Sequence, residues 1–264
     1  MATEPMQYPI GVKILAAAAL VGIVAAIFLG SFPGIDLELS RLFWDPETRL
    51  FPLWQASLFR FANDLVEFLA VTYGIAVAIG FLATFVRGPI FLGLSRRAWL
   101  FLIASLALGP GLVANTVLKE ISGRARPRHL AEFGGTLDFT AVFQASDQCT
   151  TNCSFISGDT AFAFSLLSLA LLVPQRRRAV AAVLAFGAFI GAVRILQGAH
   201  FLSDVVFSGV FMAMVVATLH LTMVEPRPWA GGRRPVRRVD WRYPLWLFFR
   251  AQPEDLGVGR ERED

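Results

Sequence analysis

The chain has 264 residues, of which 55% are hydrophobic and only 17% are charged. This composition is far too apolar for an average soluble domain and excludes an ordinary cytosolic enzyme. The formal net charge of +4 by itself says little about nucleic acid. We expect no nucleic-acid partner because the sequence has no basic strip interleaved with the aromatic residues on which single strands stack.

Six long apolar runs predict six transmembrane helices. Four of them have about the 20 residues that a helix needs to cross the hydrocarbon of a bilayer. The other two are shorter, but they are too rich in Ala, Leu, Val and Phe to be loops. In chain order the runs are 14–35, 68–86, 98–118, 160–175, 179–193 and 205–224. We therefore expect an all-α fold, a six-helix bundle whose first run is a retained helix and not a cleaved leader.

The segments between these runs define the expected organisation. Residues 36–66 form the first outer segment, in which alternating apolar and charged residues favour a short interfacial helix before Pro46 and Pro52 break it. Residues 119–156 form the longest outer segment. We expect one membrane domain over residues 1–224, followed by an Arg-rich cytoplasmic tail over residues 225–264.

Arginine positions predict the orientation. Basic residues lie between the second and third runs, between the fourth and fifth runs, and after the sixth. The residues in the first two of these positions are Arg87, Arg96, Arg97, Arg176, Arg177 and Arg178. The positive-inside rule places all three regions in the cytoplasm. We expect a multi-pass protein of the bacterial cytoplasmic (inner) membrane, with both termini inside.

Five ionisable residues converge on the opposite, periplasmic side. In the six-helix topology each lies where a helix meets this face: Lys119, Asp159, Arg194, His200 and Asp204. An ionisable residue at membrane depth costs about 2.5 to 3.5 kcal/mol on insertion scales, so such residues usually pair or mark a site. The sequence therefore predicts a polar site at the outer leaflet.

The spacing of these residues indicates phosphoryl chemistry. His200 and Asp204 are four residues apart, so on one helix face the carboxylate hydrogen-bonds one imidazole nitrogen and leaves the other free to attack. Lys119, Arg126 and Arg194 supply three cations for the negative charge of a phosphoryl group.

Two neighbouring residues add backbone donors to this predicted site. Ser157 and Gly158 begin the fourth helix, where free N–H groups and the helix dipole favour an anion.

Three motifs in this order resemble the type-2 phosphatidic-acid phosphatase superfamily, which shares its site with vanadium-dependent haloperoxidases. Lys119, six residues and then Arg126-Pro127 match the first signature. The stretch 156–159, Ile-Ser-Gly-Asp, resembles the second, Pro-Ser-Gly-His. Arg194, five residues, His200, three residues and Asp204 resemble the third.

This resemblance implies an integral-membrane lipid phosphatase that needs neither metal nor cofactor. His200 would attack phosphorus to form a phosphohistidine, with Asp204 in support. Lys119, Arg126, Arg194 and the backbone of Ser157 and Gly158 would hold the phosphate, and water would then release it.

Two departures from the family pattern concern the catalytic acid and one phosphate ligand. Asp159 stands where the family has a His that protonates the leaving oxygen, so either Asp159 or His129 is the expected acid. Val193 replaces a Ser whose hydroxyl would bind phosphate. Arg124 and Arg128 flank the first motif and are interpreted as residues that steer anionic headgroups.

Cys149 and Cys153 are the only cysteines and lie in the long outer segment. Their spacing permits a disulfide in an oxidising compartment, and two free thiols are the alternative.

Several functions remain open at this stage. Within the family, the Ser-Gly-acidic variant, the loop around Cys153 and the stretch 32–37 most resemble lipid A phosphatases. Phosphatases of undecaprenyl pyrophosphate or phosphatidylglycerophosphate, a lipid phosphotransferase and a non-catalytic lipid-binding member are the alternatives.

Overall fold

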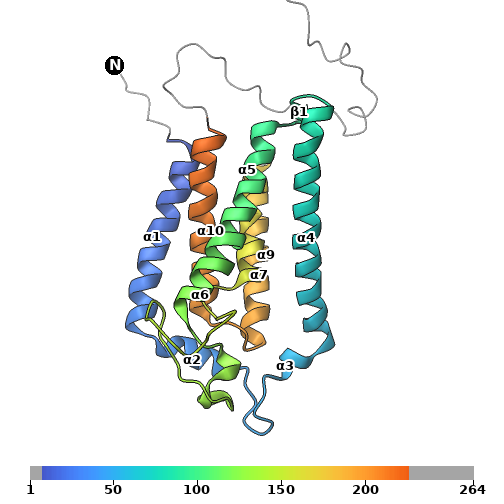
Figure 1. Ribbon diagram of the computed structural model, residues 1–264. Coiled ribbons are helices and arrows are strands. Elements are labelled where there is room, and N and C mark those ends of the chain that lie inside the picture. Colours follow the sequence, from blue (N-terminus) through green and yellow to red (C-terminus); the bar gives the residue numbers. More distant parts are fainter. Residues whose placement is uncertain (1–7, 226–264) are drawn as a thin grey trace, which may run out of the picture.

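The computed structural model describes residues 8–225, and its long helices run side by side to form an elongated bundle (Figure 1). Four long helices frame the bundle. They are α1 (Ile10–Ser31), α4 (Ser57–Val86), α9 (Arg176–Leu196) and α10 (Leu202–Met223). The expected all-α fold is confirmed, since the only sheet in the described part is the two-stranded hairpin of β1 (Ile90–Phe91) and β2 (Leu94–Ser95).

A fifth long segment is helical throughout but changes its winding. It comprises α5 (Arg96–Leu106), the π-helix η1 (Ala107–Leu118) and α6 (Lys119–Ser122). Pro110 lies inside the π-helical stretch and has no N–H to donate to the preceding turn, so a regular α-helix cannot continue through it. The segment ends beside the polar residues of the first motif.

Five helical segments in the described residues are long and apolar enough to cross a membrane. The sixth predicted crossing corresponds to α7 (Gly158–Ser165) and α8 (Leu167–Leu172), an apolar pair that is shorter than a full span. This pair packs against α5, α9 and α10. The count of six therefore stays a prediction.

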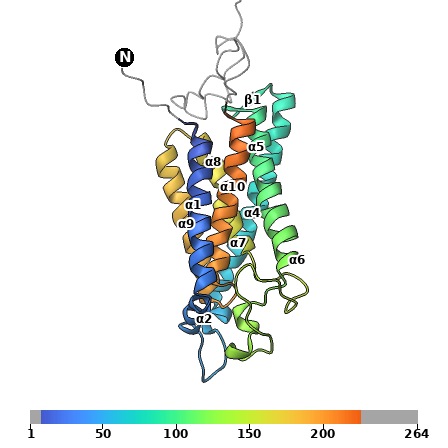
Figure 2. The ribbon, with the colours of Figure 1, turned by 90° about the vertical axis from the view of Figure 1, so that its left-hand side faces the viewer.

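Small residues bring α1 against α10. The buried positions of α1 are Gly11, Ala18, Gly22 and Leu29, which form a stripe along one face. A Cβ at Gly22 would lie 2.9 Å from Cγ1 of Val210, so only glycine allows this approach. Close backbone approach through small residues is how membrane helices gain packing energy without a hydrophobic driving force. Figure 2 shows the two helices alongside each other over their length.

The outward faces of the long helices are apolar. Large exposed side chains include Ile23 and Ile27 on α1, and Phe68, Ile79 and Leu82 on α4. Exposed apolar surface of this extent is a liability in water and is the normal surface of a helix in lipid. These faces therefore mark the sides of the bundle as its lipid contact.

Short elements cover the end of the bundle at the bottom of Figure 1. They are α2 (Gly34–Arg41), α3 (Pro52–Gln55), η2 (Pro127–His129) and η3 (Ala131–Phe133). The short helix expected after the first membrane helix is present as α2. The proposed Arg-rich tail lies outside the described residues, apart from Glu225.

Candidate active site

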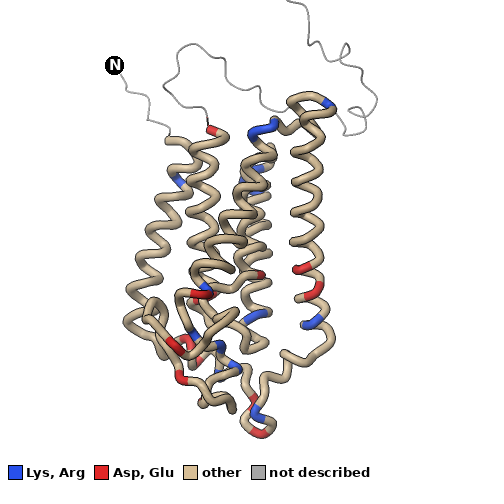
Figure 3. The backbone as a smooth tube through the Cα atoms, viewed as in Figure 1, with Lys and Arg blue, Asp and Glu red and all other residues tan. Residues whose placement is uncertain are grey.

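The predicted site residues come together at one end of the bundle. Charged residues gather at the two ends (Figure 3), and the three motifs all lie toward the end that carries α2. The first motif begins in α6 and ends at the start of η2, the second begins α7, and the third joins α9 to α10. Residues separated by more than 80 positions in the sequence therefore face a common volume.

His200 lies in the tight turn between α9 and α10 and is only 2% exposed. Its Nδ1 lies 2.8 Å from the backbone carbonyl oxygen of Ser154. A carbonyl can only accept, so Nδ1 carries the proton and Nε2 keeps its lone pair. We expected the carboxylate of Asp204 to make this hydrogen bond, but its Oδ2 lies 3.6 Å from Nδ1, beyond hydrogen-bond distance. The backbone carbonyl orients the imidazole instead.

The environment keeps His200 neutral. Burial is the main cause that lowers the pKa of His200, and the charges of Arg126 and Arg194 lower it further against the opposing effect of Asp204. Two cations from separate motifs therefore act on the same imidazole. A neutral, oriented imidazole with a free nitrogen is a competent nucleophile.

Asp204, in the first turn of α10, is fully buried and accepts hydrogen bonds at both oxygens. Ser154 Oγ donates to Oδ2 at 2.6 Å, and the backbone N–H of Phe201 donates to the same oxygen at 2.9 Å. Oδ1 accepts from Arg124 at 2.7 Å. Ser154 thus contacts Asp204 through its hydroxyl and His200 through its carbonyl.

We expected Arg124 to steer anionic headgroups, but this expectation is wrong, because Arg124 is buried and forms ion pairs inside the protein. Its side chain is 2% exposed, and its guanidinium forms ion pairs with Asp204 at 2.7 Å and with Asp36 at 2.8 Å. The hydroxyl and N–H of Ser203 also donate to Asp36. A buried guanidinium needs such partners because an unpaired charge in the interior is strongly destabilising. The network ties α2 to the first turn of α10.

Lys119 and Arg126 of the first motif share one partner, Asn152. The Asn152 Oδ1 accepts from Lys119 Nζ at 3.1 Å and from an Nη of Arg126 at 2.8 Å. The Asn152 carbonyl also accepts from Arg126. Oxygen atoms of Asn152 therefore occupy donors that a phosphate would need.

A disulfide holds the loop that carries Asn152. Cys149 and Cys153 are bonded, so the pair that the sequence left open is a bridge in this structure. Asn152 itself has a positive φ of 50°, a conformation in which Asn is among the better tolerated residues.

The second motif forms the start of α7. Ser157 is the residue before the helix and is fully buried, with its Oγ accepting from Thr160. A Cβ at Gly158 would lie 2.6 Å from Asn115 Oδ1 and 3.1 Å from Lys119 Nζ. The absence of a side chain at Gly158 thus leaves room for Lys119 over the helix N-terminus.

Asp159 is ion-paired with Arg194, with 3.1 Å between Oδ2 and Nε. The Asp159 side chain is 36% exposed, whereas that of Arg194 is 11% exposed. Arg194 also donates to Gln197 Oε1 at 3.1 Å. The guanidinium in the last turn of α9 is therefore held from two sides.

The other two histidines have different surroundings. His129 Nε2 accepts a hydrogen bond from Nε of Arg128 at 3.2 Å. His220 lies near the opposite end of α10, where it contacts Phe101 and Glu225.

Sequence reasoning missed four residues of this site: Asp36, Arg124, Asn152 and Ser154. The sequence contains only weak indications that these residues belong to the site. Asp36 and Asn152 lie in stretches that resemble lipid A phosphatases, and Arg124 lies two residues before Arg126 of the first motif. Their pairing depends on loops that approach one another only in three dimensions.

This bundle and this constellation define a membrane phosphatase of the PAP2 superfamily. The PAP2 superfamily matches residues 98–229, which include all three motifs, and the chain belongs to this family. It is a multi-pass membrane protein and a phosphoric monoester hydrolase that acts on a membrane lipid.

Three curated relatives are similar over most of the chain, and each is a lipid A 4'-phosphatase. The protein of Francisella tularensis subsp. novicida is 31% identical over 210 residues, which cover 77% of this chain and 92% of the relative. That of Rhizobium leguminosarum is 35% identical (72% and 87%), and that of Rhizobium etli is 32% identical (72% and 79%). No solved structure matches the chain.

Proposed function

We propose that the protein removes the 4'-phosphate of lipid A. The observation that carries this proposal is the likeness to three relatives, each a lipid A 4'-phosphatase that matches between 72% and 77% of this chain. The arrangement of the motif residues around His200 agrees with this activity. The core motifs bind phosphate and do not read the lipid. Undecaprenyl pyrophosphate and phosphatidylglycerophosphate are therefore the alternative substrates that the assay must include.

In the first step, Nε2 of His200 attacks phosphorus. The N–P bond forms as the bond between phosphorus and the sugar oxygen breaks, and the departing oxygen receives a proton. Lys119, Arg126 and Arg194 neutralise the equatorial oxygens, assisted by backbone N–H groups of Ser157 and Gly158 at the start of α7. Asp204 stabilises the imidazole once it carries positive charge.

In the second step, water attacks the phosphohistidine. The N–P bond breaks, inorganic phosphate leaves and neutral His200 is restored. Of the two acids that the sequence suggested, His129 accepts a hydrogen bond from Arg128 at Nε2, so this nitrogen is not the proton donor in this arrangement. Asp159 is ion-paired with Arg194, so we assign to Asp159 the positioning of Arg194. In the first step a water molecule therefore gives the proton to the leaving sugar oxygen, and the hydroxide that remains takes a proton from the water that attacks in the second step.

We place the protein in the bacterial inner membrane, with the site at the periplasmic face and both termini in the cytoplasm. The disulfide beside the site supports this orientation, because disulfides persist in the oxidising periplasm. The arginines Arg96, Arg97 and Arg176 begin helices at the other end of the bundle, as the positive-inside rule requires.

The substrate is tested with purified full-length protein in detergent. Lipid A, undecaprenyl pyrophosphate and phosphatidylglycerophosphate are incubated separately, and the products are resolved by thin-layer chromatography and mass spectrometry. We expect loss of one phosphate from the 4' position of lipid A, with release of inorganic phosphate. If the protein hydrolyses undecaprenyl pyrophosphate or phosphatidylglycerophosphate but not lipid A, the proposal that lipid A is the substrate is rejected. Transfer of labelled phosphate to a lipid acceptor would instead identify a phosphotransferase.

The nucleophile is tested in the same assay by His200→Ala. Without the imidazole no phosphohistidine forms, and we expect turnover to fall by at least about a hundredfold. His220→Ala, which alters a histidine at the opposite end of α10, serves as the control and should retain activity. Unchanged turnover by His200→Ala would reject the assignment.

A further inference from the structure

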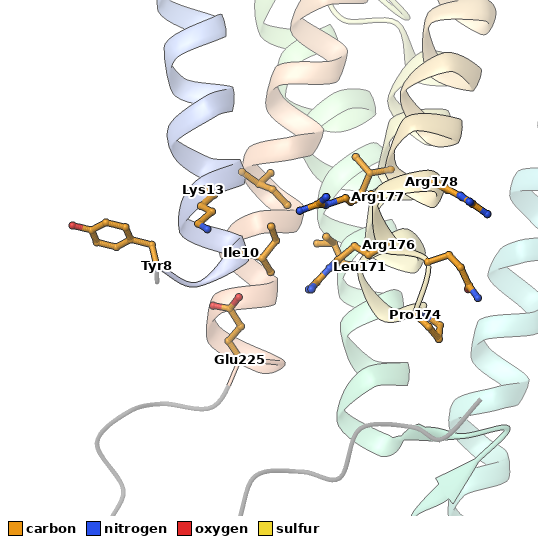
Figure 4. Close-up of a pocket in the computed structure, with 12 residues that line it drawn as sticks. Tyr8, Ile10, Lys13, Leu171, Pro174, Arg176, Arg177, Arg178 and Glu225 are labelled. Atoms are coloured by element: carbon orange, nitrogen blue, oxygen red, sulfur yellow. The ribbon is translucent and has the colours of Figure 1, made fainter. Parts of the chain in front are cut away.

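A cavity lies at the end of the bundle opposite the candidate active site. It has a volume of about 960 Å³ and opens between the first turns of α1, the end of α8 and the first turn of α9 (Figure 4). Apolar side chains form part of its wall, among them Ile10, Ile14, Leu171 and Val180. The cavity is thus large and apolar enough to take part of an acyl chain.

Basic residues surround this cavity on two sides. Lys13 belongs to α1, and Arg176, Arg177 and Arg178 form the first turn of α9. Figure 4 shows Lys13 and Arg177 on facing walls of the cavity. Within residues 8–225 none of these four cations forms an ion pair.

The start of α9 adds further donors. Gln175, the residue before the helix, provides no side-chain cap, so the first backbone N–H groups of this 21-residue helix remain available. Free N–H groups and the positive end of the helix dipole both favour an anion. Cationic side chains and uncapped amides thus gather at one place on the wall.

Among residues 8–225, the one acidic residue that lines the cavity does not neutralise these cations. Glu225 accepts a hydrogen bond from the backbone N–H of Gly11 at 3.1 Å, and the same oxygen lies 3.4 Å from His220 Nδ1. Its carboxylate is therefore engaged with α1 and α10. Four cations against one carboxylate leave the cavity strongly positive.

We propose that this cavity binds an anionic phospholipid from the leaflet opposite the candidate active site. The phosphodiester contacts Lys13, Arg177 and the start of α9, and an acyl chain lies against Ile14, Leu171 and Val180. Charge decides the occupant: each basic residue near a bilayer surface favours an anionic lipid by about fivefold. This site is independent of the phosphatase activity and adds a lipid ligand that is not a substrate.

The test is native mass spectrometry of the full-length protein in detergent. The protein is titrated with phosphatidylglycerol or with phosphatidylcholine of the same acyl chains, so that both lipids carry a phosphate and only one is anionic. We expect the wild type to retain phosphatidylglycerol at least about fivefold better than phosphatidylcholine. Equal retention of the two lipids would overturn the proposal.

A matched pair of variants localises the effect. Lys13→Gln combined with Arg177→Gln removes two cations of the cavity, and the preference for phosphatidylglycerol should be lost. Arg87→Gln combined with Arg97→Gln removes two exposed cations from the same end of the bundle but outside the cavity, and the preference should remain. If both double variants lose the preference for phosphatidylglycerol to the same extent, the preference arises from general surface charge, and the proposed site is rejected.

A conservative variant guards against misfolding. Arg177→Lys keeps the charge and should keep the preference, and all variants should show the same size-exclusion profile as the wild type. Should the cavity pair lose its folded profile, Arg177→Gln alone replaces it. The single variant should then lower the preference by about fivefold, and an unchanged preference would overturn the proposal.

Discussion

Arg124 links two buried carboxylates, and this link connects a residue of α2 to the first turn of α10, beside His200. Asp36 contacts Arg124 and Ser203, while Arg124 contacts Asp204, which lies beside His200. Each carboxylate compensates part of the guanidinium charge in a region that water does not reach. The orientation of Asp204 therefore depends on a residue 168 positions earlier in the chain.

The substitution Asp36→Asn tests this dependence. Loss of one buried partner leaves Arg124 poorly compensated, so we expect the free energy of unfolding to fall by about 3 kcal/mol. Because Asp204 loses its alignment, we expect kcat to fall by up to about a hundredfold with little change in KM. Steady-state kinetics and thermal unfolding in detergent measure the two effects.

Two variants at α2 make the result specific. Asp36→Glu keeps the charge and should recover part of kcat. Glu38→Gln changes an exposed acid on the same helix, paired only with Arg41 at its surface, and should behave like the wild type. A normal kcat for Asp36→Asn would mean that α2 has no part in positioning the site.

The lowered pKa of His200 predicts the pH dependence of its charge. An ordinary histidine takes up a proton as the pH falls through about 6.5. Because the folded-state pKa is lower, His200 should remain neutral and nucleophilic below that pH and lose activity only in more acidic solution. Its imidazole nitrogens can be followed by NMR of ¹⁵N-histidine-labelled protein, since the chain has only 3 histidines.

The NMR signals of His200 are assigned as those that are missing from the spectrum of the His200→Gln variant. A His200 signal that titrates near pH 6.5 would contradict the prediction.

At the scale of elements, the second outer segment brings the motifs together. Its residue Asn152 contacts Lys119 and Arg126, and its residue Ser154 contacts His200 and Asp204. The disulfide between Cys149 and Cys153 flanks Asn152 on both sides. The disulfide-closed turn therefore contacts the cations through Asn152, and the residue directly after it, Ser154, contacts the proposed nucleophile.

Replacement of both cysteines by serine should weaken phosphate binding. Without the bridge Asn152 no longer holds Lys119 and Arg126 in place, and the loss of one hydrogen bond of about 1 kcal/mol corresponds to about a fivefold rise in KM. Reductant should produce the same rise in the wild type and no further rise in the double variant. A KM that is unchanged or lower would show that Asn152 competes with substrate and does not support it.

At the scale of the whole molecule, the two ends of the bundle differ in chemistry. One end carries the disulfide and the candidate active site, and the other carries basic residues at the starts of α5 and α9. The helices between them present apolar faces to lipid. The candidate active site and the basic starts of α5 and α9 therefore lie at opposite ends of the bundle.

Single-cysteine labelling tests the proposed orientation. In a background without the native cysteines, Glu47→Cys places a thiol on the exposed loop between α2 and α3, and Arg97→Cys places one at the opposite end. A membrane-impermeant maleimide should label the first in intact spheroplasts and the second only after lysis. The reverse pattern would place the site in the cytoplasm.

Much of this arrangement was predictable from the sequence. Apolar runs identified the long helices, because hydrocarbon accepts only segments whose backbone groups are satisfied internally. The spacing of Lys119, Arg126, Arg194, His200 and Asp204 identified the phosphatase motifs. Such local patterns survive in sequence because helix geometry and short turns relate residues that are close along the chain.

The tertiary structure alone decided which groups hold the motifs in place. The sequence determined the class of protein, the helices and the motif residues, since these depend on hydropathy and on short intervals. It did not reveal that Ser154 orients His200, that Asn152 joins Lys119 to Arg126, or that Arg124 is buried between Asp36 and Asp204. Such contacts join distant loops, and their partners are fixed only when packing excludes water and each buried charge must find an opposite one.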